Sequence, residues 1–563
     1  MLLPSGEPAG WIHSSDTSNN HSETDHLSIL YFWVDSMTIH DMSTSPESDI
    51  ERNVPPTAQD PATFQKADLE RLGRQRPETF KTAISEIAFC TSMLVSMLMS
   101  EYFVSGFNIL LPTVSKELDI PIAAQIWPSS VFALIVGAIL LPLGRIGDIY
   151  GGFIVFTSGL AWFVVWTVVA GFSVNYHMLI AARALQGLGP AAFLPTGIMI
   201  LGKIYRPGPR KNLIFSLYGA FSPLGFFFGV IMGGIAGEYL TWRWYFWLGA
   251  IVIGLCSISA YLSIPRGELK TPGVKMDYWG VFTTVPALVL IVFAVTDGAH
   301  APKGWATDYI IVTVVLGFVL LGISVFVERN VAEQPLLPAS LFRPKYVKTI
   351  LVALAFAYGN FGIFMYYASF YLYTVMEYSV LSTALAFIPM AAGGIILATL
   401  GGFTLHLLPG RLLLVIAGAG EIISVLLFAL VPEGGSYWAW VLPAMIGATL
   451  GVDIAFNVTN VFITTNIAQK DQGAAGALIY SILFLPISLF LGISDVVAAS
   501  YEHRGTMVSY KAAFWFGTGC AAASLVLFCF VDTGKAESQL RVEEKEALEE
   551  SGQEDAGVVS GSN

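Results

Sequence analysis

The sequence predicts an all-α protein that crosses a membrane many times. Of its 563 residues, 55% are hydrophobic and only 12% are charged, and the mean hydropathy is +0.65. A soluble protein carries roughly 25% charged residues, so most of this surface must face lipid. The 54 glycines favour helices that approach one another closely within a bilayer. A barrel of transmembrane strands would give a much weaker hydropathy signal.

Long apolar runs predict fourteen membrane-spanning helices, because each span needs about 20 residues. Loops that carry charge, Gly or Pro separate the runs. In chain order we place the helices at 86–111, 125–143, 154–173, 178–201, 213–236, 244–264, 279–297, 309–327, 347–372, 380–403, 412–431, 438–464, 474–497 and 512–531.

Composition divides the chain further. Residues 1–83 are polar and lack the apolar content of a folded domain, so we expect a disordered tail. Residues 532–563 form a second, acidic tail, which accounts for part of the formal charge of −12. Between them we expect a six-helix half at 84–264, two central helices with their loops at 265–346, and a second six-helix half at 347–531.

The distribution of Lys and Arg predicts the orientation of the spans. With both termini in the cytosol, fourteen basic residues fall in inner loops and five in outer loops. Cytoplasmic loops are enriched in Lys and Arg. We therefore predict a multi-pass protein with both termini cytosolic, in the plasma membrane or, alternatively, the vacuolar membrane.

The sequence carries no pattern typical of an enzyme. All four cysteines fall within predicted spans, so neither a disulfide framework nor a metal site is expected. There is no phosphate-binding Walker loop and no basic patch that would suggest nucleic acid. We expect no cofactor and no metal, and we expect a monomer embedded in the lipid bilayer. A non-transporting membrane sensor is a further alternative, although both tails look too disordered to form a sensing domain.

A glycine-rich motif follows the second span. It reads Gly144-Arg-Ile-Gly-Asp148-Ile-Tyr-Gly151. Glycines let a short loop turn tightly between packed helices, and an acid at a helix end can pair with a basic group or a neighbouring helix N-terminus. The motif resembles the loop 2–3 motif of the major facilitator superfamily, which implies that Gly144, Asp148 and Gly151 form a conformational gate.

The fourth span contains a second motif, Arg183-Ala-Leu-Gln186-Gly187, which resembles the R-x-x-Q-G pattern of the same superfamily. Arg183 is the basic residue that we place inside a span. A charge there costs at least about 2.5 kcal/mol, so we expect an acid or a backbone carbonyl as its partner.

The fifth span carries four spaced glycines, and its pattern is similar to the antiporter motif of the superfamily with Val230 in place of the usual proline. We expect these glycines to pack closely against another helix. They are Gly225, Gly229, Gly233 and Gly234. Together with the two central helices, these motifs resemble the fourteen-span drug:proton antiporter family, of the fungal type that exports drugs, toxins or secondary metabolites.

This resemblance implies a proton-coupled exporter that works by alternating access, with its cargo site between the two halves near the membrane midplane. A proton-coupling residue must be ionisable and lie within the membrane. The candidates are Asp453, Glu101, Arg183 and Glu421. Of these, Asp453 is the best placed by position alone, because Glu101 lies two residues before the position where the family usually has its acid.

We expect the cargo to be a small organic compound, amphipathic or aromatic, because fixed charges are scarce in the spans. Such a compound calls for an apolar cavity with a few hydrogen-bonding groups. The candidate lining residues are Asn108, Gln186, Tyr358, Asn360, Tyr366 and Asn457. The alternative is the same fold with another cargo, such as vacuolar basic amino acids or siderophores.

Overall fold

The computed structural model describes residues 75–206, 208–266, 270–271, 273–404, 408–467 and 472–532. The regular structure of these residues is helical, and they contain no strand. The predicted tails, 1–83 and 532–563, lie almost entirely outside the described residues. Fourteen helices in the described parts are long and apolar enough to cross a membrane, which confirms the predicted class and number of spans.

The helices match the predicted runs in order and mostly extend them by a few residues. In chain order they are α3 (Ala83–Glu117), α4 (Trp127–Tyr150), α5 (Gly152–Gly171), α6 (Tyr176–Ile204), α7 (Pro209–Tyr239), α8 (Trp242–Ser263), α9 (Tyr278–Asp297), α10 (Asp308–Asn330), α11 (Val347–Phe370), α12 (Val380–Thr404), α13 (Gly410–Leu430), α14 (Leu442–Asn466), α15 (Gln472–Tyr501) and α16 (Thr506–Cys529).

Short polar side chains begin several of these helices. The Thr82 hydroxyl accepts a hydrogen bond from the Ser85 amide, and the Asn175 side chain accepts one from the Met178 amide. Asp277 caps α9 in the same way. Such caps satisfy amide groups that have no partner inside the helix.

A single glycine separates α4 from α5. Gly151 adopts φ = 102°, a conformation that side-chain-bearing residues rarely take. The chain therefore reverses direction within one residue, as the glycine-rich motif predicts.

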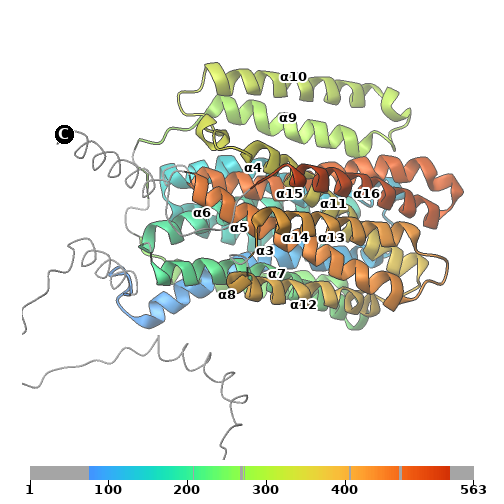
Figure 1. Ribbon diagram of the computed structural model, residues 1–563, viewed down its shortest axis with the longest axis horizontal. Coiled ribbons are helices and arrows are strands. Elements are labelled where there is room, and N and C mark those ends of the chain that lie inside the picture. Colours follow the sequence, from blue (N-terminus) through green and yellow to red (C-terminus); the bar gives the residue numbers. More distant parts are fainter. Residues whose placement is uncertain are drawn as a thin grey trace, which may run out of the picture. The chain divides into compact units, whose positions relative to one another are not determined.

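The helices form two sets and a separate pair. Helices α3–α8 make the first set and α11–α16 the second, and the sets meet where α4 packs on α15 and α7 packs on α12. Helices α9 and α10 lie side by side outside both sets, and α9 touches α4 and α15 (Figure 1). The central pair thus borders the line along which the two sets meet.

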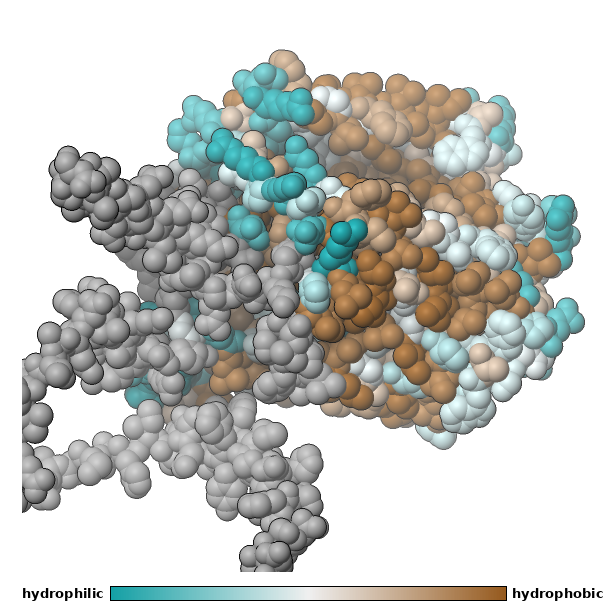
Figure 2. All heavy atoms as spheres, viewed as in Figure 1, coloured by the Kyte–Doolittle hydropathy of each residue, from teal (hydrophilic) through white to brown (hydrophobic). Residues whose placement is uncertain are grey.

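On the face that Figure 2 shows, hydrophobic side chains cover the middle of the coloured surface, and hydrophilic ones gather toward its ends. Fourteen spans bring the start of α3 and the end of α16 to one end of the bundle. We call it the basic end, because most Lys and Arg residues between spans lie there, and we call the other the opposite end.

Glycines set the distance between α3 and α7. A Cβ atom built on Gly225, Gly229 or Gly233 would collide with backbone or side-chain atoms of α3, such as the Leu98 and Gly106 carbonyls. Gly234 instead faces α12, where its Cβ would lie 2.5 Å from that of Ala384. Ion pairing adds to this packing at the basic end, where Arg210 on α7 binds Glu86 on α3 at 2.6 Å.

Candidate functional site

Arg183 lies in the core of the first set and is 1% exposed. Its guanidinium donates to the Pro128 carbonyl on α4 at 3.1 Å and to the Phe103 carbonyl on α3 at 3.2 Å. It also donates to the Gln186 side chain at 2.8 Å. No described carboxylate pairs with it. The expectation of an acid or a carbonyl is therefore met by carbonyls, and Arg183 ties three helices together.

Aromatic rings and a second amide complete this environment. The guanidinium carbon lies 4.2 Å from the centre of the Phe107 ring and 4.3 Å from that of Phe132. Gln186 in turn donates to the Thr167 hydroxyl on α5 at 2.7 Å. A Cβ on Gly187 would lie 2.9 Å from the Phe132 carbonyl, so the glycine keeps α6 close to α4. The fourth-span motif is thus a hydrogen-bonded junction of four helices.

Two carboxyl groups, one from each set, lie within range of each other's charge. Glu101 on α3 and Asp453 on α14 lie close enough to interact electrostatically. Tyr358 on α11 is within range of both charges, and Tyr218 on α7 and Tyr480 on α15 are within range of Glu101. We call these five residues the central cluster.

The central cluster contains two acids that keep some solvent-accessible surface and three tyrosines that are buried. Glu101 and Asp453 have protein on all sides, yet each keeps some solvent-accessible surface. Tyr218, Tyr358 and Tyr480 are only 4%, 6% and 6% exposed. Two ionisable groups that keep some accessible surface, beside three phenol groups, can bind protons and donate or accept hydrogen bonds.

Neighbouring residues make room for the Asp453 carboxylate. A Cβ on Gly394 of α12 would lie 3.0 Å from Asp453 Oδ2 and 3.0 Å from Pro223 of α7. One turn along α14, Asn457 donates to the Asp453 carbonyl at 2.9 Å. Across the interface, the Tyr480 hydroxyl reaches the Met97 sulfur of α3 at 3.9 Å. The carboxylate thus lies against both sets at once.

Glu421 lies apart from the acids of the central cluster, inside the second set. It is 1% exposed, and neither of its carboxyl oxygens has a hydrogen-bond partner among the described residues. A Cβ on Gly451 of α14 would lie 2.6 Å from its Cγ. Asn360 donates to the Glu421 backbone carbonyl at 3.5 Å, and its own side-chain oxygen has no partner.

The remaining predicted lining residues have different surroundings. Asn108 links α3 to α4 by accepting a hydrogen bond from Ser129 at 2.8 Å. Tyr366 packs on Phe370 with ring centres 4.7 Å apart. Of the six predicted lining residues, the structure places Tyr358 in the central cluster and Asn457 next to it.

The predicted gate motif contacts the segment that leads to the central pair. Asp148 accepts a hydrogen bond from the Thr271 hydroxyl at 3.2 Å, and the Lys203 ammonium donates to the same hydroxyl at 2.8 Å. Gly144 faces Pro195 of α6, with its built Cβ 3.2 Å away. Arg145, which the sequence did not single out, donates to the Gln334 side chain at 3.1 Å.

The interface between the sets differs at its two ends. At the opposite end, a Cβ on Gly237 of α7 would lie 2.6 Å from Val380 of α12. Ser130 and Ser488 hydrogen-bond across α4 and α15 at 2.6 Å. Toward the basic end, a Cβ on Gly219 would meet nothing within 4 Å. Among the described residues these contacts draw the sets together at the opposite end, whereas Gly219 on α7 has open space beside it.

Sequence reasoning missed Tyr218, Tyr480 and Gly394. The two tyrosines were visible as polar residues within apolar spans, which is the signal that could have marked them. Their meeting with Glu101 depends on how helices from the two sets face each other. Glu101 itself lies in the central cluster although its sequence position disfavoured it.

Comparison with known proteins gives consistent matches. A family model described as Major Facilitator Superfamily matches residues 93–491. The efflux pump terJ of Aspergillus terreus is 30% identical over 475 residues, which cover 82% of this chain and 90% of that protein. The low affinity ammonium transporter of Saccharomyces cerevisiae is 28% identical, over 83% of this chain and 92% of that one. The solved structure of an auto-inhibited peptide transporter of the POT family matches with a TM-score of 0.59 and 15% identity, covering 79% of this chain and 98% of that one.

Proposed function

The chain belongs to the Major Facilitator Superfamily of membrane transporters, and we propose that it is a proton-coupled exporter of amphipathic organic compounds. The observation that carries this proposal is that the Glu101 and Asp453 carboxyl groups, on helices of different sets, lie within range of each other's charge. Each group belongs to a different set, so a proton bound there changes the electrostatics of the interface that must rearrange during transport.

The coupling follows from like-charge repulsion. Two ionised carboxylates close together in a low-dielectric region repel each other strongly. A proton on either group removes that repulsion and lets the sets close around the pair. Loss of the proton favours separation. If a proton and a cargo molecule bind in this space in turn, each conformational cycle moves the proton one way across the membrane and the cargo the other way.

Arg183 contributes to this mechanism by fixing the backbone of α3 near Glu101. Its guanidinium holds the Phe103 carbonyl at 3.2 Å, two residues along α3 from Glu101. Because all of its observed partners are carbonyl oxygens or aromatic rings, Arg183 fixes the backbone of α3 where Glu101 must face the second set. Glu421 is a second candidate for proton binding, and its charge reaches Tyr358 of the central cluster.

The open space beside Gly219 on α7 supports entry of cargo from the basic end. We place the basic end in the cytosol, since loops rich in Lys and Arg stay on the cytoplasmic side. Cargo would then bind from the cytosol and leave at the opposite end, in keeping with the efflux pumps among the relatives. The two sets would act as six-helix halves, with the Asp148 motif as the gate. We assign the protein to the plasma membrane, with the vacuolar membrane as the alternative.

Efflux from yeast that lacks its own drug exporters tests this function. Cells would be loaded with rhodamine 6G, ethidium or Nile red, and their fluorescence followed with and without a protonophore. We expect protonophore-sensitive efflux that falls at least tenfold in Asp453→Asn and Glu101→Gln. The matched control is Glu333→Gln, which removes an exposed acid paired only with Lys275. Efflux that ignores the protonophore, or that both cluster variants retain, would rule the proposal out.

One observation favours a second candidate, the carriage of small cations. Two carboxylates and three phenol oxygens could also bind an ammonium group, and one relative is named as a low affinity ammonium transporter. The same cells distinguish the two candidates. Net accumulation of radiolabelled methylammonium or lysine, without efflux of the dyes, would favour the cation carrier.

A further inference from the structure

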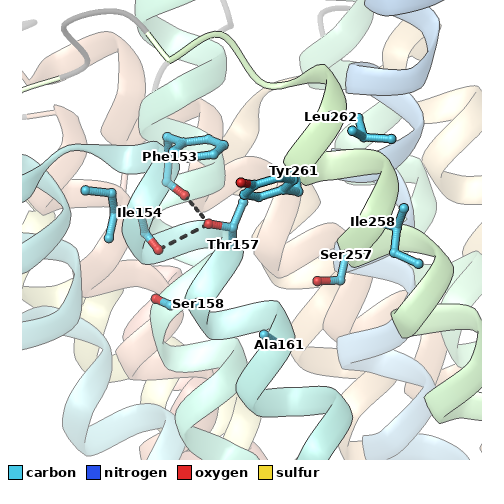
Figure 3. A pocket seen from close by; sticks show the side chains of 9 residues that line it. All are labelled: Phe153, Ile154, Thr157, Ser158, Ala161, Ser257, Ile258, Tyr261 and Leu262. Atoms are coloured by element: carbon cyan, nitrogen blue, oxygen red, sulfur yellow. Dashed lines mark hydrogen bonds between the residues drawn. The ribbon is translucent and has the colours of Figure 1, made fainter.

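An apolar groove of about 520 Å³ runs between α5 and α8 on the outer surface of the first set. Figure 3 shows Phe153 and Tyr261 toward one end of it, and Ala161 and Ser257 farther along. Ile154 and Ile258 line the groove and are 57% and 60% exposed, so it opens outward, where the bilayer would lie. This volume falls in the range of ordinary ligand sites.

The groove has the length of one leaflet. On α5 it extends from Phe153 to Ala161, which at about 1.5 Å per residue is roughly 12 Å of helix. Half of a bilayer's hydrocarbon core is about 15 Å thick. Helix α5 begins and α8 ends at the basic end, so the groove lies within the leaflet on that side.

Positive charge stands at the mouth of the groove. The Arg266 guanidinium lies 4.9 Å from the centre of the Tyr261 ring and 5.6 Å from that of Phe153, the two rings that line the groove there. Arg266 is exposed and pairs with no described acid. Lys270 lies near the start of α5, because a Cβ on Gly151, the residue before this helix, would lie 3.5 Å from the Lys270 Cγ.

Two hydroxyl groups lie along the otherwise apolar groove. The Thr157 hydroxyl is already bonded to the Phe153 carbonyl at 2.7 Å. The Ser257 hydroxyl also lines the groove and has no hydrogen-bond partner among the described residues. It is therefore free to donate to an ester oxygen.

We propose that this groove binds one anionic phospholipid from the leaflet at the basic end. An acyl chain fills the apolar groove, the Ser257 hydroxyl donates to an ester carbonyl, and Arg266 and Lys270 bind the phosphate. An arginine presents a planar fork of donors that suits phosphate oxygens. The rings under Arg266 hold its guanidinium at the mouth of the groove.

Native mass spectrometry of the full chain tests this site without measuring transport, so its result is independent of the proposed function. Purified protein in detergent would be titrated with phosphatidylserine and, separately, with phosphatidylcholine. We expect one phosphatidylserine molecule to bind well below the concentration that phosphatidylcholine needs. Loss of one basic side chain weakens binding to anionic lipid about fivefold, so Arg266→Gln should show at least that loss.

Two pairs of variants make the test specific. Ala161→Trp fills the groove and should remove the bound lipid, whereas Val165→Trp adds the same bulk one turn away on α5, where the side chain is 55% exposed. Arg329→Gln removes an exposed arginine from the end of α10, also at the basic end, and should leave binding intact. Equal lipid retention in Arg266→Gln, Ala161→Trp and the unmodified chain would overturn the proposal, as would equal affinity for the two lipids.

Discussion

Arg183 and Asp453 are both charged residues deep in the membrane-spanning region, and their surroundings are opposite. Arg183 is 1% exposed and makes hydrogen bonds to two backbone carbonyls and a side-chain amide. Asp453 keeps accessible surface and lies near a second carboxyl group across the interface. A charge whose partners are all within one rigid set is suited to hold helices together. A charge that is accessible and shared between sets is suited to exchange a proton.

The largest expected effect comes from removing the bonded charge. Arg183→Ala leaves the Phe103 and Pro128 carbonyls and Gln186 without their donor and opens a cavity between helices. Such a loss costs about 3–5 kcal/mol of unfolding free energy. We expect most of the folded protein to disappear in fluorescence-detected size-exclusion chromatography after mild heating. A variant that melts like the unmodified chain would show that these hydrogen bonds do not hold the first set together.

Removing the Asp453 charge should lower transport activity without lowering the stability of the fold. Asp453→Asn keeps the shape of the side chain and removes the group that exchanges a proton, so gradient-driven transport should fall at least tenfold while the melting temperature stays within a few degrees. Glu101→Gln should behave alike. If Asp453→Asn lost stability and transport together, Asp453 would be a structural residue like Arg183, and the two residues would not differ in role.

Gly234 and Gly219, both on α7, offer a second contrast. Gly234→Ala adds a methyl group 2.5 Å from Ala384, whereas Gly219→Ala on the same helix adds one where nothing lies within 4 Å. Gly234→Ala should push the sets apart at the opposite end and raise the labelling rate of a cysteine placed at Glu238 about threefold or more. The Gly219 variant serves as the control and should change that rate little.

Glu421 is a buried acid whose carboxyl oxygens have no described hydrogen-bond partner. It therefore tests whether a buried acid away from the interface takes part in transport. Glu421→Gln removes a buried acid without changing its volume. An uncompensated buried charge is destabilising, so we expect its removal to give a gain of about 1 kcal/mol and less than a twofold change in transport. A tenfold loss of transport would instead make Glu421 part of the proton path.

The smallest effect concerns the opposite end, where His300 bonds to Asp495 on α15 at 2.9 Å. This hydrogen bond to the carboxylate raises the pKa of His300 above its ordinary value. Partial burial lowers this pKa, and the nearby negative charges of Glu502 and Asp297 raise it further. The stabilisation is fully present below the ordinary pKa of about 6.5 and is lost as pH rises through the raised pKa. Thermal melts across this window should show a loss of stability with pH that His300→Gln lacks and that the exposed His503→Gln retains.

Much of the fold could be predicted from local pattern, but the central cluster could not. Apolar runs of span length marked all fourteen helices. The cost of burying Arg183 called for an acid or a carbonyl partner, and the structure shows carbonyls. The meeting of Glu101 with Asp453 joins residues far apart in the sequence, and it depends on helix rotation and on the room that Gly394 leaves. Asn108 accepts a hydrogen bond from Ser129 of α4, and Tyr366 packs on Phe370 of its own helix, contacts that the polarity of these residues did not indicate.

Transport by purified protein in proteoliposomes tests the central claim most directly. Rhodamine 6G movement would be measured in two modes, as exchange at equal pH and as uptake driven by an imposed pH gradient, with pyranine reporting internal pH. We predict that Asp453→Asn retains exchange but loses gradient-driven uptake and the accompanying proton flux. Gradient-driven uptake with an undiminished proton flux in that variant would contradict the claim that the central cluster couples protons to cargo.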